Sequence, residues 1–347
     1  MSSQNPISFS KKDINKAGKI LAKNNPGKIE SVWAIDVMDK WRTSHAYPMN
    51  TFNVSLRKKV KALTGETIVA QRLKRLPTIV DKLKRYPTME LVSMQDIGGL
   101  RAIVKSIKDV RKLDSIYKKT KFGHNLVKSK DYITTPKESG YRGVHLVYKY
   151  KSNLYPACNG MLIELQFRTK LQHVWATAVE TMGTFLGKAL KSSQGSKEWL
   201  KFFSATSSAF SYLEKTKPVP GYEDLTKRQI FDLVVNLEKE LNVIEKMKGF
   251  TKAATLIGNK STSKGWYYHL VILDSINKKV EVKSYSKEQI RRAASDYKKA
   301  EERARGGEKI EPVLVSAGPL KSLRTAYPNY FLDTDNFIKM ITQITAK

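Results

Sequence analysis

Three short segments rich in aliphatic and aromatic residues recur in the middle of this 347-residue chain, and they restrict its fold more than any other feature. They are LRAIV at 100–104, GVHLVYKY at 143–150 and MLIELQF at 161–167, and a helix is expected near 109–119. Short strands that alternate with helical connections favour a mixed β-sheet flanked by helices, an α/β (α+β) fold.

Helices are expected on both sides of these strands. Residues 11–63 carry an apolar stripe at helical spacing that includes Val37 and Trp41. Between Val69 and Tyr86, the string RLKRLPTIVDKLKR predicts a basic helix with a strongly cationic polar face. A helix that begins at His173, and a second one after a Gly/Ser-rich break, would complete the first domain.

The segment KTKPVPGYED at 215–224 combines two prolines with a glycine, which is typical of a linker between domains. After it come a helix, two strands (GWYYHLVIL and KKVEVKSY), a charged helix, the segment PVLVSA and a last amphipathic helix. This order predicts a small α+β module. The expected divisions are a first domain at 1–214, a linker with a connecting helix at 215–250, and a C-terminal domain at 251–347.

The net charge indicates a polyanionic partner. The chain has 63 Lys and Arg residues against 32 Asp and Glu residues, a formal net charge of +31. Lysines and arginines release condensed counterions when they neutralise phosphates, so RNA, DNA and nucleotides are all candidate partners. Individual runs such as Lys118 and Lys119 are more simply explained as solvated surface. Only the total charge argues for nucleic acid.

Cys158 is the single cysteine, which excludes a multi-cysteine zinc site within one chain, and no zinc is expected. The N-terminal sequence lacks the apolar core of a signal peptide, and no apolar run approaches the roughly 20 residues that span a bilayer. We therefore expect a cytoplasmic protein with no membrane partner. The sequence leaves its oligomeric state open.

Two carboxylates stand where strands could bring them together. Asp96 lies at the entry to one predicted strand and Glu164 lies within another. Phosphoryl and pyrophosphoryl transfer need cations that hold a triphosphate, a carboxylate-bound Mg²⁺ and a base that activates the accepting hydroxyl. Either acid alone is weak evidence, because an isolated acid at a strand edge is usually solvated or salt-bridged.

The strings around these acids are more specific. DIGGLR at 96–101, DYITTPKESGYRGVH at 131–145 and IELQFRTKLQHVWA at 163–176 follow the basic string in order. With these four motifs, residues 69–180 resemble the synthetase region of the RelA/SpoT family, whose members make the alarmone (p)ppGpp. The resemblance implies a nucleotidyltransferase-like fold and transfer of pyrophosphate from ATP to a ribose hydroxyl of another nucleotide or of RNA.

The resemblance also implies roles for residues that match the family motifs. Asp96 and Glu164 would be catalytic and would bind Mg²⁺, with Glu164 also implicated in deprotonating the attacking hydroxyl. ATP would be the donor, its adenine held between two guanidiniums. The implied ATP-binding residues are Arg72, Lys74, Thr78, Lys82 and Arg101, with Thr78 standing where serine is usual.

The acceptor site is implied in the same way. Tyr141 would stack on the acceptor base, and His145 would lie near the acceptor phosphates. The other implied acceptor residues are Gln166, Arg168 and His173. Taken singly, Tyr141 could equally be a core residue and His145 a strand histidine with a hydrogen-bond partner. Gly143 replaces a serine common in the family's GYxSxH pattern, which points to a different acceptor.

Three functions remain open from the sequence. The charge of +31 favours the 3′ end of tRNA as the acceptor, because a tRNA presents many phosphates beyond its terminal adenosine. The first alternative is an alarmone synthetase that uses GDP or GTP. The second is a non-catalytic, RNA-binding regulator built on a synthetase scaffold, against which the intact Asp96 and Glu164 argue.

The overall layout resembles the CapRel group of fused toxin–antitoxin proteins of phage defence. That resemblance implies a C-terminal zinc-finger-like fold without metal ligands, and a phage capsid protein as the trigger. It also implies that Tyr327 and Tyr330, which form a YxxY element, plug the ATP site and inhibit the enzyme. The alternative is that these tyrosines only pack the small core of the tail.

Overall fold

The chain forms two compact units, which are described separately. In this computed structural model, the described residues are 9–23, 27–63, 65–119, 122–186, 196–260, 265–274, 277, 279–316 and 330–346. Unit 1 comprises Met1–Ile133 and Gly143–Lys170, and unit 2 comprises Thr134–Arg142 and Leu171–Lys347. The expected division into a first domain at 1–214, a linker at 215–250 and a C-terminal domain at 251–347 assigns a function to each part, and it stays a prediction.

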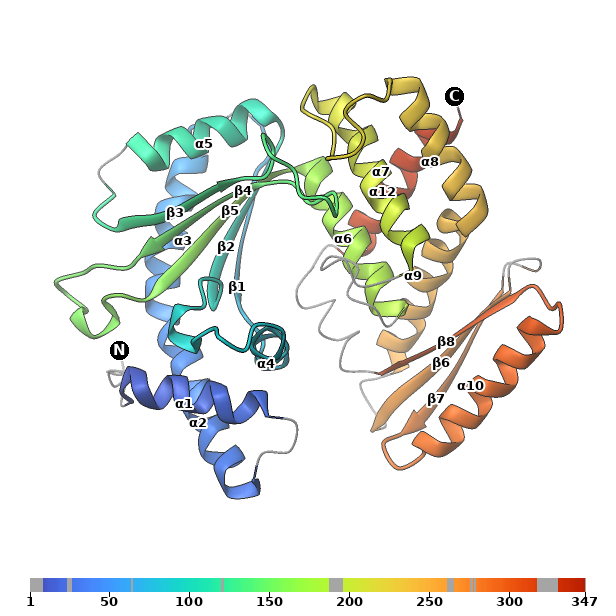
Figure 1. The fold of residues 1–347 in the computed structure, drawn as a ribbon, viewed down its shortest axis with the longest axis horizontal. Coiled ribbons are helices and arrows are strands. Elements are labelled where there is room, and N and C mark those ends of the chain that lie inside the picture. Colours follow the sequence, from blue (N-terminus) through green and yellow to red (C-terminus); the bar gives the residue numbers. More distant parts are fainter. Residues whose placement is uncertain are drawn as a thin grey trace. The chain divides into compact units, whose positions relative to one another are not determined.

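Unit 1 begins with three helices, which confirms the helical prediction for this stretch (Figure 1). They are α1 (Lys11–Ala22), α2 (Lys28–Ser44) and α3 (Ala46–Val60). The start of α1 is set by a capping box, in which the Ser10 hydroxyl accepts a hydrogen bond from the Asp13 amide and the Asp13 carboxylate accepts one from the Ser10 amide.

A five-stranded mixed sheet forms the centre of unit 1, as the alternating pattern predicts. Its strands are β1 (Ile68–Leu73), β2 (Gly98–Val104), β3 (Asn125–Asp131), β4 (Val144–Lys149) and β5 (Leu162–Thr169). Their order is β1-β2-β5-β4-β3, and β2 and β5 are parallel while the other neighbours are antiparallel. The connections contain α4 (Leu76–Arg85), α5 (Ile107–Lys119) and the 3₁₀ turns Leu91–Ser93 and Pro156–Cys158.

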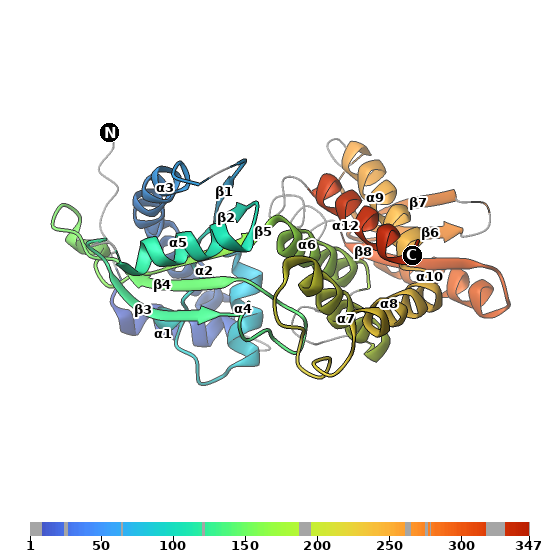
Figure 2. The same ribbon diagram turned by 90° about the horizontal axis from the view of Figure 1, so that it is seen from above.

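One face of this sheet is apolar. Helices lie over the sheet (Figure 2). Leu100, Leu165 and Leu146 form one row across β2, β5 and β4, and each is at most 2% exposed. On this face, the ring of Phe167 lies 5.6 Å from that of Tyr117 on α5. Because side chains alternate between the two faces of a strand, the residues between these apolar positions lie on the opposite face.

The basic helix predicted for 69–86 is wrong in its first half. Ile68–Leu73 is strand β1, paired with β2, and the helix begins only at Leu76. Pairing with a neighbouring strand satisfies the backbone of this stretch, so tertiary contacts override its helix-like pattern. Strand β3 is missing from the prediction because it is a polar strand whose residues are almost all exposed, so it lacks the apolar signal of a buried strand.

Unit 2 combines a helical layer with a small sheet. Its helices are α6 (Lys170–Phe185, whose first residue belongs to unit 1), α7 (Lys197–Glu214), α8 (Lys227–Leu241), α9 (Val243–Lys260) and α12 (Tyr330–Thr345). The C-terminal helix α12 joins this layer, because the ring of Phe337 lies 6.1 Å from that of Phe203 and 6.0 Å from that of Phe210, both on α7.

The small sheet of unit 2 confirms the two predicted C-terminal strands and adds a third. β6 (Trp266–Asp274) lies between β7 (Lys279–Ser286) and β8 (Ile310–Ser316), and both pairings are antiparallel. Helix α10 (Ile290–Arg305) packs on this sheet through a cluster that includes Leu270 and Ala293. The likeness to a zinc-finger fold stays a prediction. Within the described ranges, no helix is both long and apolar enough to cross a bilayer.

Replacing Phe52 with alanine should destabilise unit 1. Phe52 on α3 is 0% exposed, and its ring lies 4.9 Å from that of Phe122 and 5.7 Å from that of Tyr148. A large cavity in a packed core costs about 3–5 kcal/mol, measurable by denaturant unfolding. Val54→Ala on the same helix is the control, because Val54 is 62% exposed and should change stability by less than about 0.5 kcal/mol. Equal effects of the two substitutions would contradict the assignment of this core.

Candidate active site

The second face of the central sheet of unit 1 is polar. Arg101 on β2, Gln166 on β5 and His145 on β4 occupy one row of the register. In the neighbouring row, Arg72 on β1 pairs with Gly99 on β2, and Gly99 pairs with Glu164 on β5. Since Gly99 has no side chain, the space above the sheet between Arg72 and Glu164 stays open.

Asp96, two residues before β2, lies between two lysines. Its Oδ2 lies 2.7 Å from Nζ of Lys74, which follows β1, and its Oδ1 lies 2.9 Å from Nζ of Lys82 on α4. Burial by itself would raise the pKa of Asp96, but the charges and hydrogen bonds of the two lysines outweigh it and lower the pKa to about 2. Asp96 is therefore ionised at neutral pH, and two of the predicted phosphate-binding lysines are its partners.

Glu164 is held by two other predicted site residues. Nδ1 of His145 lies 2.8 Å from Oε1, and Nε2 of Gln166 donates to Oε2 at 2.7 Å. Burial would raise the pKa of Glu164, but the hydrogen bond and charge of His145 outweigh it, so the pKa is lowered. The Asp96 carboxylate acts in the opposite direction on the same pKa. The two acids are thus close enough to interact electrostatically.

The two carboxylates have the chemistry that Mg²⁺ requires. Mg²⁺ prefers oxygen ligands, and it is commonly held by one or two carboxylates together with water and substrate phosphates. Every carboxylate oxygen of Asp96 and Glu164 already accepts a hydrogen bond, but each has a second lone pair. Among the described residues, no group of three or more His, Cys, Asp and Glu side chains could hold a metal by itself. Asp96 and Glu164 would therefore need substrate oxygens to complete the site.

Two further predicted residues of unit 1 lie on elements that also carry residues of this cluster. Thr78 is half-buried near the start of α4, the helix that carries Lys82. Arg168 on β5 is 1% exposed, and its Nη2 donates to Oε1 of Gln166 at 3.0 Å. The structure therefore links Glu164, Gln166, His145 and Arg168 through hydrogen bonds.

Tyr141 and His173 belong to unit 2. Tyr141 is 5% exposed, and Nζ of Lys137 lies 5.4 Å from the centre of its ring. An acceptor base would therefore have to displace a covering side chain before it could stack on this ring. Nε2 of His173 on α6 lies 3.1 Å from Oδ2 of Asp333 on α12. In this structure His173 thus contacts the C-terminal helix, and its predicted contact with the acceptor stays a prediction.

The YxxY element falls at the margin of the described residues. Tyr327 lies outside them, and Tyr330 is the first residue of α12, with a side chain outside the described part. Their predicted insertion into the ATP site stays a prediction.

Two residues of the site had no role assigned from the sequence. The ring of Tyr132 meets that of His145 edge-on at a centroid distance of 5.3 Å. Lys137 lies over Tyr141. Both stand inside the string DYITTPKESGYRGVH, so their place in that motif was the available signal. Their contacts depend on how the chain turns back between β3 and β4, where the Tyr132 amide donates to the Gly143 carbonyl and the Lys137 amide to the Tyr141 carbonyl. The sequence alone does not reveal this turn.

A comparison with known proteins matches the part of the chain that carries the four motifs. Residues 71–183 match the family model described as the region found in RelA / SpoT proteins. The chain is 36% identical over 114 residues to the GTP pyrophosphokinase YjbM of Bacillus subtilis (strain 168), a match that covers 31% of this chain and 52% of the relative. It is 35% identical over 111 residues to the GTP pyrophosphokinase YwaC of the same organism, covering 30% of this chain and 52% of the relative.

Among solved structures, the chain is similar to the small alarmone synthetase 1 from Bacillus subtilis, with 26% identity and a TM-score of 0.44. This match covers 52% of this chain and 93% of that one. The chain spans about half the length of the curated relatives that it matches, 52% of each. Residues 71–183 of this chain are thus similar to the RelA / SpoT region, and about a third of the chain is similar to part of two GTP pyrophosphokinases.

Replacing Asp96 with asparagine should make the fold less stable and less sensitive to acid. Because folding lowers the pKa of Asp96 from 3.8 to about 2, its ionised form stabilises the fold above pH 3.8, and this stabilisation is lost as the pH falls towards 2. Asp96→Asn should lower the free energy of unfolding at pH 7 by about 2 kcal/mol and flatten its decline with acid. Denaturant unfolding across this pH range measures both effects.

Asp36→Asn is the matched control, because Asp36 forms an exposed ion pair with Lys40 at 2.8 Å. An exposed pair contributes little, so this variant should follow the wild-type pH profile. If Asp96→Asn also followed that profile, the strong pairing of Asp96 would be refuted.

Proposed function

We propose that this protein is an ATP-dependent pyrophosphokinase that transfers pyrophosphate to the 3′ end of tRNA and so blocks translation. The observation that carries the proposal is the cluster on the polar face of the sheet. There, Asp96 with its two lysines and Glu164 with His145 and Gln166 interact electrostatically within a region similar to known pyrophosphokinases.

The donor side of the cluster suits ATP. Lys74 and Lys82 are both paired with the single carboxylate of Asp96, which leaves positive charge over, and the phosphates of ATP would compete with this carboxylate for the two lysines. Arg72 and Arg101 present guanidiniums from β1 and β2 on the same face, and guanidiniums bind an adenine ring by stacking and cation-π contact. Thr78 would add a hydroxyl donor to the phosphates.

Asp96 and Glu164 would hold the Mg²⁺ that accompanies ATP. A bound Mg²⁺ would neutralise negative charge on the phosphates of the transferring group. Glu164 has a lowered pKa and therefore holds a proton weakly. This favours the role of metal ligand for Glu164 over the role of strong general base. In its neutral form, His145, 2.8 Å from Glu164, would offer a second acceptor for the proton that leaves the attacking hydroxyl; the protonated form, whose charge lowers the pKa of Glu164, could not.

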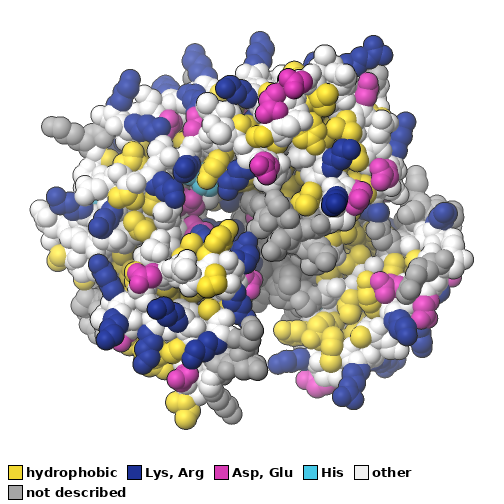
Figure 3. Space-filling view, in the orientation of Figure 1, with side chains coloured by type: hydrophobic (Ala, Val, Ile, Leu, Met, Phe, Trp, Pro, Cys, Tyr) yellow, Lys and Arg dark blue, Asp and Glu magenta, His cyan; other side chains and the backbone are white. Residues whose placement is uncertain are grey.

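The charge of the chain favours tRNA as the acceptor. A free nucleotide needs only a local cluster of cations, whereas a tRNA gains from positive charge over a wide surface. Lys and Arg side chains are frequent on the face of unit 1 that Figure 3 shows, consistent with the net charge of +31. Synthesis of (p)ppGpp from GDP or GTP is the second candidate, because both curated relatives are named GTP pyrophosphokinases.

Regulation by the C-terminal domain completes the proposal. Residues 251–347 would hold the enzyme inactive, with Tyr327 and Tyr330 inserted between Arg72 and Arg101 in place of adenine. A phage protein such as a capsid protein would bind this domain and shift the population to an open, active state. The support is the resemblance in overall layout to fused toxin–antitoxin proteins.

Labelling with γ-³²P ATP tests the reaction and its acceptor. The full chain carrying Tyr327→Ala and Tyr330→Ala should transfer label to deacylated tRNA, and adding Glu164→Gln should reduce the rate at least about 100-fold, because this removes an ionised ligand of the metal site. Glu245→Gln is the matched control, since Glu245 forms an exposed pair with Lys248 on α9, and it should leave the rate unchanged.

The acceptors separate the candidate functions. Label in GDP or GTP and none in tRNA would identify an alarmone synthetase. Translation arrest that persists in the Glu164→Gln variant would favour the non-catalytic RNA-binding regulator.

The tail itself is tested by toxicity. If Tyr327 and Tyr330 occupy the ATP site, replacing both with alanine should increase growth inhibition in cells that express the full chain without any trigger. Replacing both with phenylalanine keeps the rings and should preserve inhibition. Growth inhibition that stays equal to that of wild type in the alanine variant would remove the plug from the proposal.

A further inference from the structure

The segment that carries Tyr141 is anchored within unit 2. Thr134–Arg142 clusters with the helices of that unit, whereas the strands on either side of it, β3 and β4, belong to unit 1. Gly140 shows how close the packing is: its φ is +88°, and a Cβ there would lie 2.8 Å from the Trp175 ring and 2.9 Å from Cβ of Ser207. The segment therefore lies directly against α6 and α7.

Arg142 makes the strongest of these attachments. It is 3% exposed, its Nε donates to Oγ of Ser207 at 3.0 Å, and its Nη2 donates to the carbonyl of Lys217 at 2.6 Å. Nη1 reaches Oγ1 of Thr216 at 3.5 Å. Ser207 in turn donates to the carbonyl of Gly140 at 2.6 Å. One guanidinium thus joins the segment to the middle of α7 and to the chain just beyond its C-terminal end.

The surroundings compensate the charge of Arg142. Burial lowers its pKa to about 10, and the charge of Glu214 opposes this shift, so the guanidinium remains charged at neutral pH. Glu214 is the last residue of α7, and its Oε2 accepts a hydrogen bond from Gln172 at 2.9 Å. A cation beside the C-terminal end of a helix also interacts favourably with the helix dipole. These contacts explain how a buried guanidinium is accommodated.

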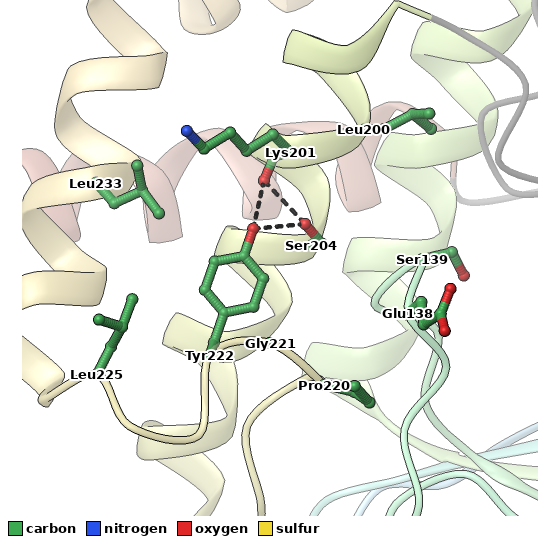
Figure 4. Close-up of a pocket in the computed structure, with 10 residues that line it drawn as sticks. All are labelled: Glu138, Ser139, Leu200, Lys201, Ser204, Pro220, Gly221, Tyr222, Leu225 and Leu233. Carbon is green, nitrogen blue, oxygen red and sulfur yellow. Dashed lines mark hydrogen bonds between the residues drawn. The ribbon is translucent and has the colours of Figure 1, made fainter.

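The segment also borders a pocket. Glu138 and Ser139 line a pocket of about 620 Å³ together with Leu200, Lys201 and Tyr222 (Figure 4). In the lining of this pocket, the Tyr222 hydroxyl lies 2.9 Å from Oγ of Ser204. Since Gly140 and Arg142 flank Tyr141 in the chain, their contacts with α6 and α7 fix the segment on both sides of Tyr141.

We propose that Arg142 is a positioning residue, whose buried guanidinium holds Tyr141 in place for the acceptor by tying its segment to α7. The inference rests on the proposed function, in which Tyr141 stacks on the acceptor base. It deepens that function by making acceptor binding, and not ATP binding, dependent on a residue anchored in the helices of unit 2.

The test uses Arg142→Lys and Arg142→Gln in the full chain carrying Tyr327→Ala and Tyr330→Ala. Lysine keeps the charge but lacks the planar fork that spans Ser207 and Lys217, so both variants should raise the KM for the acceptor by about 10- to 100-fold. The KM for ATP should stay within about twofold, because the hydrogen bonds of Arg142 run to Ser207, Thr216 and Lys217 and none of these is a predicted donor residue. Ser207→Ala removes one partner of the clamp and should shift the same constant in the same direction, by less.

Arg303→Lys is the matched control, because Arg303 forms an exposed ion pair with Glu308 on the small sheet module. This variant should leave both KM values unchanged. Equal rises in both KM values for the Arg142 variants, or a fall in kcat alone, would overturn the proposal, because a general structural defect has that signature.

Hydrogen exchange separates this inference from the proposed function. In Arg142→Gln and Ser207→Ala, the amides of residues 134–142 should exchange at least about tenfold faster than in the parent chain, whether or not any acceptor is labelled. Unchanged exchange in this segment would refute the clamp even if pyrophosphate transfer were established. Faster exchange in a protein that labels no acceptor would keep the clamp and refute the reaction.

Discussion

The parallel pairing of β2 and β5 is the constraint on which the candidate site depends. It aligns Gly99 with Glu164 and Arg101 with Gln166, and Asp96 comes two residues before β2. The alternation of side chains then separates an apolar face, which α3 and α5 cover, from a charged face. A shift of one residue in this register would move Glu164 to the apolar face and bury an acid without its partners, so packing and chemistry are determined together.

The two acids of the charged face have partners on the same face. Asp96 forms ion pairs with Lys74 and Lys82, while Glu164 accepts hydrogen bonds from His145 and Gln166. Pairing offsets the free-energy cost of burying these charges, whereas a buried charge without a partner destabilises the fold. In the proposed function, binding of a nucleoside triphosphate exchanges the partners of Lys74 and Lys82, because its phosphates replace the Asp96 carboxylate beside these lysines.

The predicted acceptor residues are divided between the two compact units. His145, Gln166 and Arg168 lie on the strands of unit 1, whereas Tyr141 and His173 lie in unit 2. Arg142 ties the Tyr141 segment to α7, and Asp333 of the C-terminal helix contacts His173. In unit 2, residues of the synthetase-like motifs therefore contact elements far along the chain.

The sequence by itself determined the helices of 11–63 and the strands β2, β4, β5, β6 and β7, because each carries a periodic apolar pattern. It also singled out Asp96 and Glu164 through ordered motifs. Strands β1 and β3 were decided by tertiary structure, since pairing with β2 overrides the helix-like pattern of one and the exposed edge of the sheet removes the apolar signal of the other. The partners of each charge, such as Lys74 for Asp96 and His145 for Glu164, were likewise decided there, because hydrogen bonds and ion pairs act over a few ångströms in space between residues distant in the chain.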